Sequence, residues 1–163
     1  MPDIFSPQLY VVSHCLFNPA ARVRGIKKPV PFDFYYDYFD SKNQSARSEF
    51  VISLPCPETI LFGADRKKAT KDQLDSPKYR RFCADLFLPY AEMIEQFEKD
   101  GFSILILGVS KSPSCGVCVT TTGLPEDEQD TDFEGTVMSG LGIFMEEIQK
   151  ELNRRHVCYR MRE

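Results

Sequence analysis

The stretch Ile104-Leu-Ile-Leu-Gly-Val109 is followed directly by Ser110-Lys-Ser-Pro-Ser-Cys-Gly116. A short, mostly aliphatic run that breaks into Gly, Pro and Ser is typical of a buried strand that feeds an exposed loop. Cys115 therefore follows the C-terminal end of a predicted central strand. In open α/β sheets, ligands bind at this edge of the sheet.

Two other cysteines stand in the same sequence context. Apolar runs over residues 9–13 and 50–54 are each predicted to form a strand, and Cys15 and Cys56 follow them. If the three strands are parallel neighbours, their C-terminal ends lie at the same edge of the sheet. The sequence therefore predicts that three thiols meet there.

Helix signals separate these strands. Ser76-Pro77 is a typical helix start and Gly101 a typical stop, with Pro89 between them predicted to kink or split the helix. A second long helix is predicted from apolar residues that recur three and four positions apart from Met138 to Leu152. Aromatic spacing over residues 32–39 predicts a short helix as well.

The remaining segments complete the expected fold. Residues 117–121 read as a short extension, residues 124–131 as an acidic surface loop, and residues 156–161 as a last strand. Strands that alternate with helices indicate a mostly parallel sheet. The expected fold class is α/β: a single compact Rossmann-like domain over residues 1–163, with helices on both faces of the sheet. No strand is followed by the Gly-x-Gly-x-x-Gly fingerprint of dinucleotide sites.

Size and composition restrict the function. The chain has 163 residues, 42% of them hydrophobic, with a formal net charge of −4. It contains neither an apolar run long enough to span a membrane nor a signal-peptide pattern, so a cytoplasmic protein is expected. The expected oligomeric state is a monomer or a homodimer. An acidic chain favours a small-molecule partner over a tRNA. In a reducing compartment, its six cysteines point to metal or catalysis rather than to disulfides.

Three converging thiolates suit an iron–sulfur cluster, because soft sulfur ligands select such clusters. A [4Fe-4S] cluster held by only three cysteines keeps one iron open for a substrate atom. Glu58, two residues after Cys56, is a candidate general base. Ser112 and Ser114 either donate to a ligand or stabilise the loop.

Other interpretations remain open at this level. The cysteines could be ordinary packing residues, as expected for Cys83 and Cys158. Cys115-x-x-Cys118 is a weak zinc or redox signal. The basic residues that follow the first strand form either a solvated loop or an anion-attracting rim over the cysteines: Arg22, Arg24, Lys27 and Lys28.

Three segments resemble, in order, the signatures of the DUF523 (thiouracil desulfidase) family. They are Val12-Ser-His-Cys-Leu16, Pro55-Cys-Pro-Glu58 and Ser110-Lys-Ser-Pro-Ser-Cys-Gly116. The resemblance extends over about residues 9–145, and the Ser-Pro-Ser-Cys-Gly run is its most specific part.

The resemblance implies a compact Rossmann-like domain that removes sulfur from thiolated uracil or thiouridine without redox chemistry. It implies that Cys15, Cys56 and Cys115 bind a [4Fe-4S] cluster whose open iron takes the sulfur. Glu58 is then the catalytic acid/base that activates water, and Ser112 its hydroxyl partner. The implied partner is a small thiolated nucleobase or nucleoside.

The sequence departs from this pattern at positions where a substrate would be bound. Phe17-Asn18 replaces the usual Leu-Gly, and Phe62-Gly-Ala-Asp-Arg66 replaces Gly-Gly-Leu-Pro-x-Pro-Arg. Cys118 is an additional thiol that could close the fourth iron. Two rival functions follow: an iron–sulfur protein that carries sulfide without catalysis, and a zinc-binding structural module.

Overall fold

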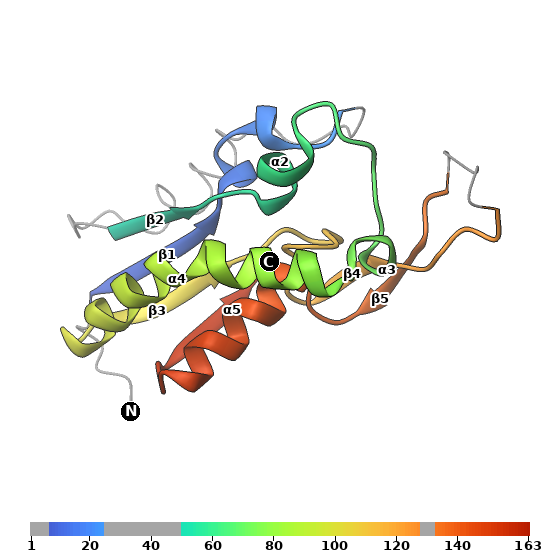
Figure 1. Ribbon diagram of the computed structural model, residues 1–163. Helices are drawn as coiled ribbons and strands as arrows, with labels where there is room; N and C mark the ends of the chain where they lie inside the picture. Colours follow the sequence, from blue (N-terminus) through green and yellow to red (C-terminus); the bar gives the residue numbers. More distant parts are fainter. Residues whose placement is uncertain (1–6, 25–49, 128–132) are drawn as a thin grey trace.

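A parallel four-stranded sheet forms the centre of the computed structural model, which describes residues 7–24, 50–127 and 133–163 (Figure 1). Its order is β2-β1-β3-β6, and every neighbouring pair is parallel. The strands span Gln8–Ser13 (β1), Phe50–Leu54 (β2), Ser103–Leu107 (β3) and Tyr159–Arg162 (β6). The predicted α/β class and the parallel sheet are confirmed.

The strand order creates a switch point in the sheet. From β1 the chain moves outward to β2, and then returns to place β3 on the other side of β1, followed by β6. Ligands of open α/β sheets bind where such a reversal leaves a crevice at the C-terminal ends of two adjacent strands. Here those two strands are β1 and β3. Cys15 and Cys115 are the cysteines that follow them.

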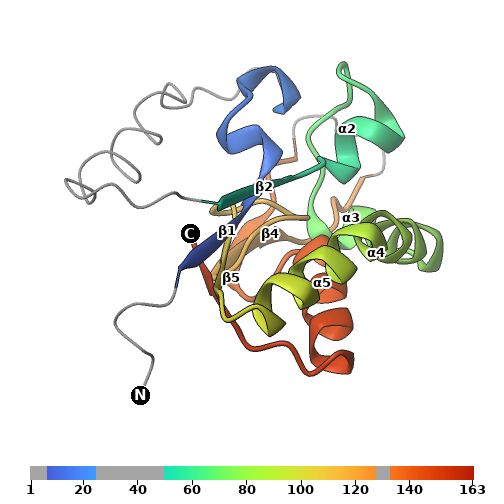
Figure 2. The ribbon, with the colours of Figure 1, turned by 90° about the vertical axis from the view of Figure 1, so that its left-hand side faces the viewer.

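The two long helices, α4 (Pro77–Lys99) and α5 (Ile143–Arg154), pack against the same face of the sheet (Figure 2). Their buried side chains join those that alternate along β1 and β3, such as Leu9, Val11, Ile104 and Ile106, in one apolar core. On the opposite face, Leu16 and Phe17 pack against Val12, Leu105 and Leu107. The helix expected over residues 32–39 lies outside the described residues.

Helix α4 is continuous through Pro89, so of the predicted kink or split the split is wrong. The proline removes the hydrogen bond to the carbonyl of Asp85, but both residues lie on the exposed side of the helix, where water can satisfy that carbonyl. The packed side of the helix is free of proline. Its start at Ser76-Pro77 is confirmed, with the Ser76 hydroxyl accepting from the Tyr79 N–H.

Met138 does not belong to the last helix, which begins only at Ile143. Instead it lies in β5 (Thr136–Ser139), which pairs antiparallel with β4 (Val119–Thr122). The expected extension at 117–121 is thus one strand of a separate hairpin, and Gly140 separates β5 from the helix. The hairpin projects beyond the C-terminal ends of the sheet strands (Figure 1).

Short helical turns complete the described part of the chain. They are the 3-10 turns η1 (His14–Leu16) and η2 (Pro19–Ala21), and the helices α2 (Pro57–Phe62) and α3 (Lys71–Leu74). Among the described residues, no helix has both the length and the apolar content that crossing a bilayer requires.

Ion pairs join the two long helices at one end. Arg155 bonds to Glu95 of α4 and Glu151 of α5, and Arg154 also bonds to Glu151. The hydrogen bond from Arg154 lowers the pKa of Glu151 to about 2, and burial opposes the shift only in part. The pair therefore adds stability above the ordinary pKa of 4.5, and this stability is lost as the pH falls toward 2.

We expect Glu151→Gln to lower the free energy of unfolding at pH 7 by roughly 1 kcal/mol or less, because the pairs are only partly buried. The difference from wild type should shrink as the pH falls to about 2, since the wild-type carboxylate then becomes protonated. Urea unfolding at several pH values measures this. Glu92→Gln, at an exposed position of α4, is the control. A difference that does not change with pH would contradict the assignment.

Candidate functional site

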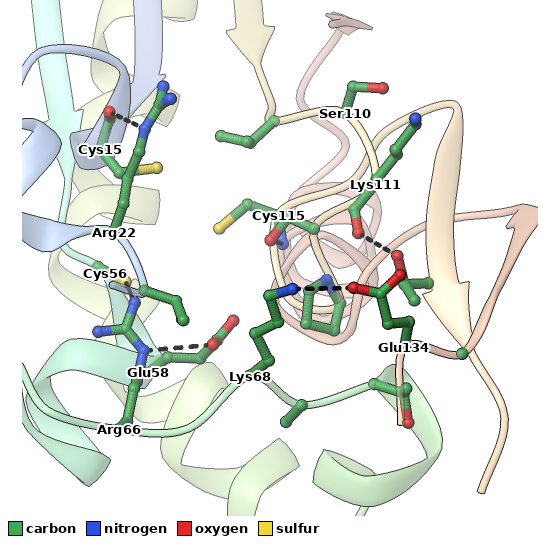
Figure 3. Close-up of a pocket in the computed structure, with 18 of the residues that line it drawn as sticks. Cys15, Arg22, Cys56, Glu58, Arg66, Lys68, Ser110, Lys111, Cys115 and Glu134 are labelled. Carbon is green, nitrogen blue, oxygen red and sulfur yellow. Dashed lines mark hydrogen bonds and ion pairs between the residues drawn. The ribbon is translucent and has the colours of Figure 1, made fainter. Parts of the chain in front are cut away.

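One cavity of about 440 Å³ lies at the C-terminal ends of the parallel strands. Cys15, Cys56 and Cys115 all line it, as do Glu58 and Ser112. Figure 3 shows Cys15 and Cys115 turning their sulfur atoms toward the same space, with Cys56 and Glu58 on the same side of the cavity. The three cysteines thus meet at one edge of the sheet, as their positions after three strands predicted.

Local structure holds each cysteine at this edge. Cys15 lies in η1, immediately after β1, and its carbonyl accepts a hydrogen bond from Arg22 Nε at 2.8 Å. Cys56 is the N-cap residue of α2, with Pro57 in the first helical turn. Cys115 lies in the loop after β3, where its N–H donates to Ser112 Oγ at 3.0 Å.

The loop that carries Cys115 rests on the N-terminus of α5. The N–H groups of Gly142, Ile143 and Met145 donate to three carbonyls of the loop, at 2.9, 2.9 and 3.1 Å. Those carbonyls belong to Gly116, Pro113 and Ser114. The unpaired N–H groups of a helix start are thereby satisfied, and the loop is fixed along most of its length. Cys115 is consequently held by backbone contacts rather than by its own side chain.

Glu58 is buried, with 6% of its surface exposed, and both of its carboxylate oxygens are hydrogen-bonded. Ser114 Oγ donates to Oε1 at 2.7 Å, and Arg66 Nε donates to Oε2 at 3.4 Å. Tyr79 OH lies 2.7 Å from Ser114 Oγ. Because the serine proton is directed to Glu58, the tyrosine must be the donor to the serine. Two hydrogen bonds therefore point in the same direction, from Tyr79 to Ser114 and from Ser114 to the carboxylate.

The hydroxyl that is hydrogen-bonded to Glu58 is thus that of Ser114. The catalytic role expected for Ser112 stays a prediction. Ser114 is oriented inward because its backbone lies on α5, and it is not among the residues that line the cavity. Ser112 does line the cavity. Its oxygen accepts from the Cys115 N–H, which leaves its own proton available to a ligand.

Arg66 is a site residue that the sequence did not single out for a role. Its side chain is almost fully buried, and it donates to the Ala21 carbonyl at 2.8 Å as well as to Glu58. Its Nη2 also contacts Cys56 Sγ at 3.9 Å, and its Nη1 donates to the Gly63 carbonyl at 3.3 Å. Arg66 therefore neutralises the buried carboxylate and ties it to the turn that follows Cys15. The only sequence signal was its position in the segment that replaces the glycine-rich family pattern.

The basic residues that follow β1 lie in different environments. Arg22 lines the cavity, whereas Arg24 is exposed and pairs with Asp65 at 2.8 Å. Lys27 and Lys28 lie outside the described residues. Lys68 and Lys111 add positive charge to the cavity wall, and Lys68 pairs with the exposed Glu134 at 3.3 Å (Figure 3).

The remaining cysteines lie elsewhere. Cys83 is fully buried in α4, in keeping with a packing role, and burial raises its pKa to about 12. Cys118 and Cys158 are exposed. Cys118 is not among the residues that line the cavity, although it is only three positions from Cys115.

Electrostatics at the three cysteines favours a cationic ligand. Burial raises the pKa of the Cys115 thiol, and the neighbouring Cys15, Cys56 and Glu58 raise it further. A smaller effect of the Ser13 hydroxyl acts in the opposite direction. Thiolates crowded in this way repel one another unless positive charge lies between them. Within the described ranges, no group of three His, Cys, Asp or Glu side chains is close enough to share one metal ion. The ligands of a four-iron core bind different iron atoms and need not meet at one point.

Ser13 gives a second observation on the fit of such a core. It is 3% exposed, and its hydroxyl makes no standard hydrogen bond with any described residue. An unpaired buried polar group costs about 1–3 kcal/mol. Ser13 ends β1, two residues before Cys15, so this unpaired hydroxyl lies at the edge of the sheet where the cysteines meet. The three converging thiols fit a metal centre that is bound through thiolates.

No model of a known protein family matches the sequence. An uncharacterised protein of Methanocaldococcus jannaschii is 25% identical over 151 residues, which are 92% of this chain and 81% of that protein. A solved structure described as a [4Fe-4S]-dependent thiouracil desulfidase superposes with a TM-score of 0.49 and 19% identity. That alignment covers 94% of this chain and 89% of the other. Neither likeness is close enough to assign the chain to a family.

Proposed function

We propose that this protein is a [4Fe-4S]-dependent desulfidase of a thiolated pyrimidine, of the 2-thiouracil or thiouridine type. The observation that carries the proposal is the meeting of three cysteines and one buried carboxylate in a single cavity at the switch point of the sheet. Cys15, Cys56 and Cys115 would hold the cluster. The sequence resemblance of the same residues to the desulfidase signatures supports this assignment.

When bound, a cluster with one iron free of protein ligands supplies a Lewis acid that polarises a C=S bond and accepts the sulfur. The overall reaction replaces sulfur by oxygen from water and releases hydrosulfide, without net oxidation or reduction. Glu58 takes the proton of the attacking water, and Ser114 and Arg66 hold its two oxygens in place. Ser112 offers a proton to the ligand from the cavity wall.

The size and chemistry of the cavity support a small substrate. Its volume of about 440 Å³ lies in the range of small-molecule sites. The lining of the cavity also includes Phe133 and Val137, which offer apolar contact to a flat ring, and Thr121. A free base or a nucleoside is therefore the preferred ligand class.

Cluster assembly is the first test of this function. After anaerobic reconstitution with iron and sulfide, wild type should bind about four irons per chain and show the brown absorbance of a cluster. We expect Cys115→Ser to lose most of this iron. Cys118→Ser is the matched control and should retain it, because Cys118 is exposed and outside the cavity. Sulfide release from 2-thiouracil or thiouridine then tests the activity.

Other outcomes of this test favour the rival functions. A colourless protein that holds zinc would support the structural module. Loss of the cluster in Cys118→Ser would mean a fourth protein ligand and a closed site, as in a sulfide carrier. A brown protein that releases no sulfide from either substrate would support the cluster assignment and contradict the desulfidase activity.

The two serines of the loop should differ in what they affect. We expect Ser112→Ala to lower the rate of sulfide release by about 100-fold with little effect on stability, because Ser112 faces the cavity. Ser114→Ala should lower the free energy of unfolding by about 1–3 kcal/mol, since it leaves Glu58 Oε1 buried without a donor. Urea unfolding and sulfide assays separate the two. Equal effects of both variants would contradict these assignments.

A further inference from the structure

The turn that carries Cys15 is held differently from the segments that carry the other two cysteines. Cys56 is the N-cap residue of α2 and the Cys115 loop rests on the start of α5, so backbone bonds at helix starts fix both. Cys15 lies in η1, a 3-10 turn of three residues whose start has no side-chain cap. Side-chain contacts on both sides of Cys15 are therefore important to the position of this turn.

His14 and Asn18 make such contacts. Asn18 Nδ2 lies 3.1 Å from His14 Nε2, and His14 Nδ1 lies 3.2 Å from Ser53 Oγ in β2. The Asn18 side chain also caps η2, since its Oδ1 accepts from the Ala20 N–H at 3.1 Å. One histidine and one asparagine thus join the end of β1 to the neighbouring strand and to the next turn of the chain.

The Asn18 cap decides which ring nitrogen of His14 carries the proton. Because Oδ1 is directed at the Ala20 N–H, the amide nitrogen is the atom that faces the imidazole. An amide NH2 group only donates, so His14 Nε2 must be the acceptor and Nδ1 must carry the proton. Nδ1 then donates to Ser53 Oγ. Both ring nitrogens are thereby engaged, and His14 is not free to bind iron although it is adjacent to Cys15.

We propose that His14 and Asn18 are positioning residues of the metal centre, and that the Nδ1–H tautomer of His14 holds the Cys15 turn in the position that binds iron. This inference rests on the proposed function. Neither residue is among those that line the cavity, so the role requires no contact with a substrate. Asn18 stands where the desulfidase signature usually has glycine. Here this departure from the signature supports a cluster ligand instead of changing the wall of the cavity.

The tautomer is tested first, on the ¹⁵N-labelled full chain before iron is added. Long-range ¹H–¹⁵N spectra at about pH 8, where a solvated imidazole is neutral, show which ring nitrogen carries the proton. We expect Nδ1 to carry it in wild-type His14. Asn18→Asp keeps the size and the acceptor oxygen but has no N–H, so the proton should be found on Nε2. His156, the other histidine of the chain, is exposed and should not change.

Iron retention is tested next, on the reconstituted protein. Asn18→Gly removes the amide, and glycine is still tolerated at a helix N-cap. We expect this variant to release iron to a chelator several-fold faster than wild type, because the Cys15 turn is less firmly held. Asn153→Ala is the matched control. It removes another asparagine that bonds to a nearby side chain, close to the C-terminal end of α5, and should release iron at the wild-type rate.

Each measurement can overturn the inference. A wild-type His14 with its proton on Nε2, or an unchanged tautomer in Asn18→Asp, would contradict the assigned contacts. Iron release from Asn18→Gly that is as slow as in wild type, or no faster than in Asn153→Ala, would show that these contacts do not position Cys15. Wild-type protein that assembles no cluster would overturn this inference and the proposed function together. If wild type binds the cluster but does not desulfurate, only the proposed activity fails, and the release rates still decide the role of Asn18.

Discussion

Glu58→Gln is expected to lower the rate of sulfide release by about 100- to 10,000-fold, the range typical of a lost general base. Glutamine has nearly the size of glutamate but cannot take a proton from water. Its carbonyl oxygen can still accept from Ser114, so the local packing should survive. The number of irons bound should not change, because Glu58 is not a cluster ligand in the proposed function. Single-turnover sulfide release and an iron count on the same samples measure both.

Glu134→Gln is the matched control for this prediction. Glu134 also lines the cavity, but its side chain is 81% exposed and its partner Lys68 lies at the rim. Removing this charge should leave the rate close to that of wild type. If Glu58→Gln loses iron as well as activity, Glu58 is structural. If both variants keep the wild-type rate, the proton is taken by another group.

Much of the fold could be predicted from the sequence because its strands are apolar and its helix ends are strongly marked. The strand over 50–54 and the helix start at Ser76-Pro77 were correct, since a short apolar run and a helix cap are both local sequence signals. Met138 was misplaced because it stands three residues before Leu141, so that one apolar residue of a short strand extended the spacing of the helix that follows. Gly140 was the available signal for the break. Whether α4 continues through Pro89 depends on which side of the helix faces water, and this is a tertiary property.

The candidate site could be predicted to the level of its converging cysteines but not of its hydrogen bonds. Cys15, Cys56 and Cys115 could be grouped because parallel strands bring their ends together. The choice between Ser112 and Ser114 could not be made, since both flank the same proline and only the packing on α5 decides which faces Glu58. Tyr79 gave no signal at all: its hydroxyl reaches Ser114 from a helix that reads as ordinary core.

Gly142→Ala is expected to have the largest effect on stability, at about 3 kcal/mol of unfolding free energy. The backbone at Gly142 is ordinary, with φ of −72°, so the cost is steric. A Cβ at this position would lie 2.4 Å from the Ser114 carbonyl carbon and 2.8 Å from the Cys115 nitrogen. These are backbone atoms, which can yield only if the loop moves off α5. Because Cys115 moves with the loop, iron binding should fall as well.

Gly101→Ala separates the loop effect from a general loss of stability. Gly101 follows α4 with a left-handed φ of +90°, and nothing lies within 4 Å of the added Cβ. Its cost is conformational, about 1 kcal/mol, and it arises at the opposite end of β3 from Cys115. Iron binding should therefore be unchanged in Gly101→Ala and reduced in Gly142→Ala, as measured by urea unfolding and iron counts. If Gly142→Ala is as stable and as rich in iron as wild type, the loop does not rest on the start of α5, and the position of Cys115 must be set by the cluster itself.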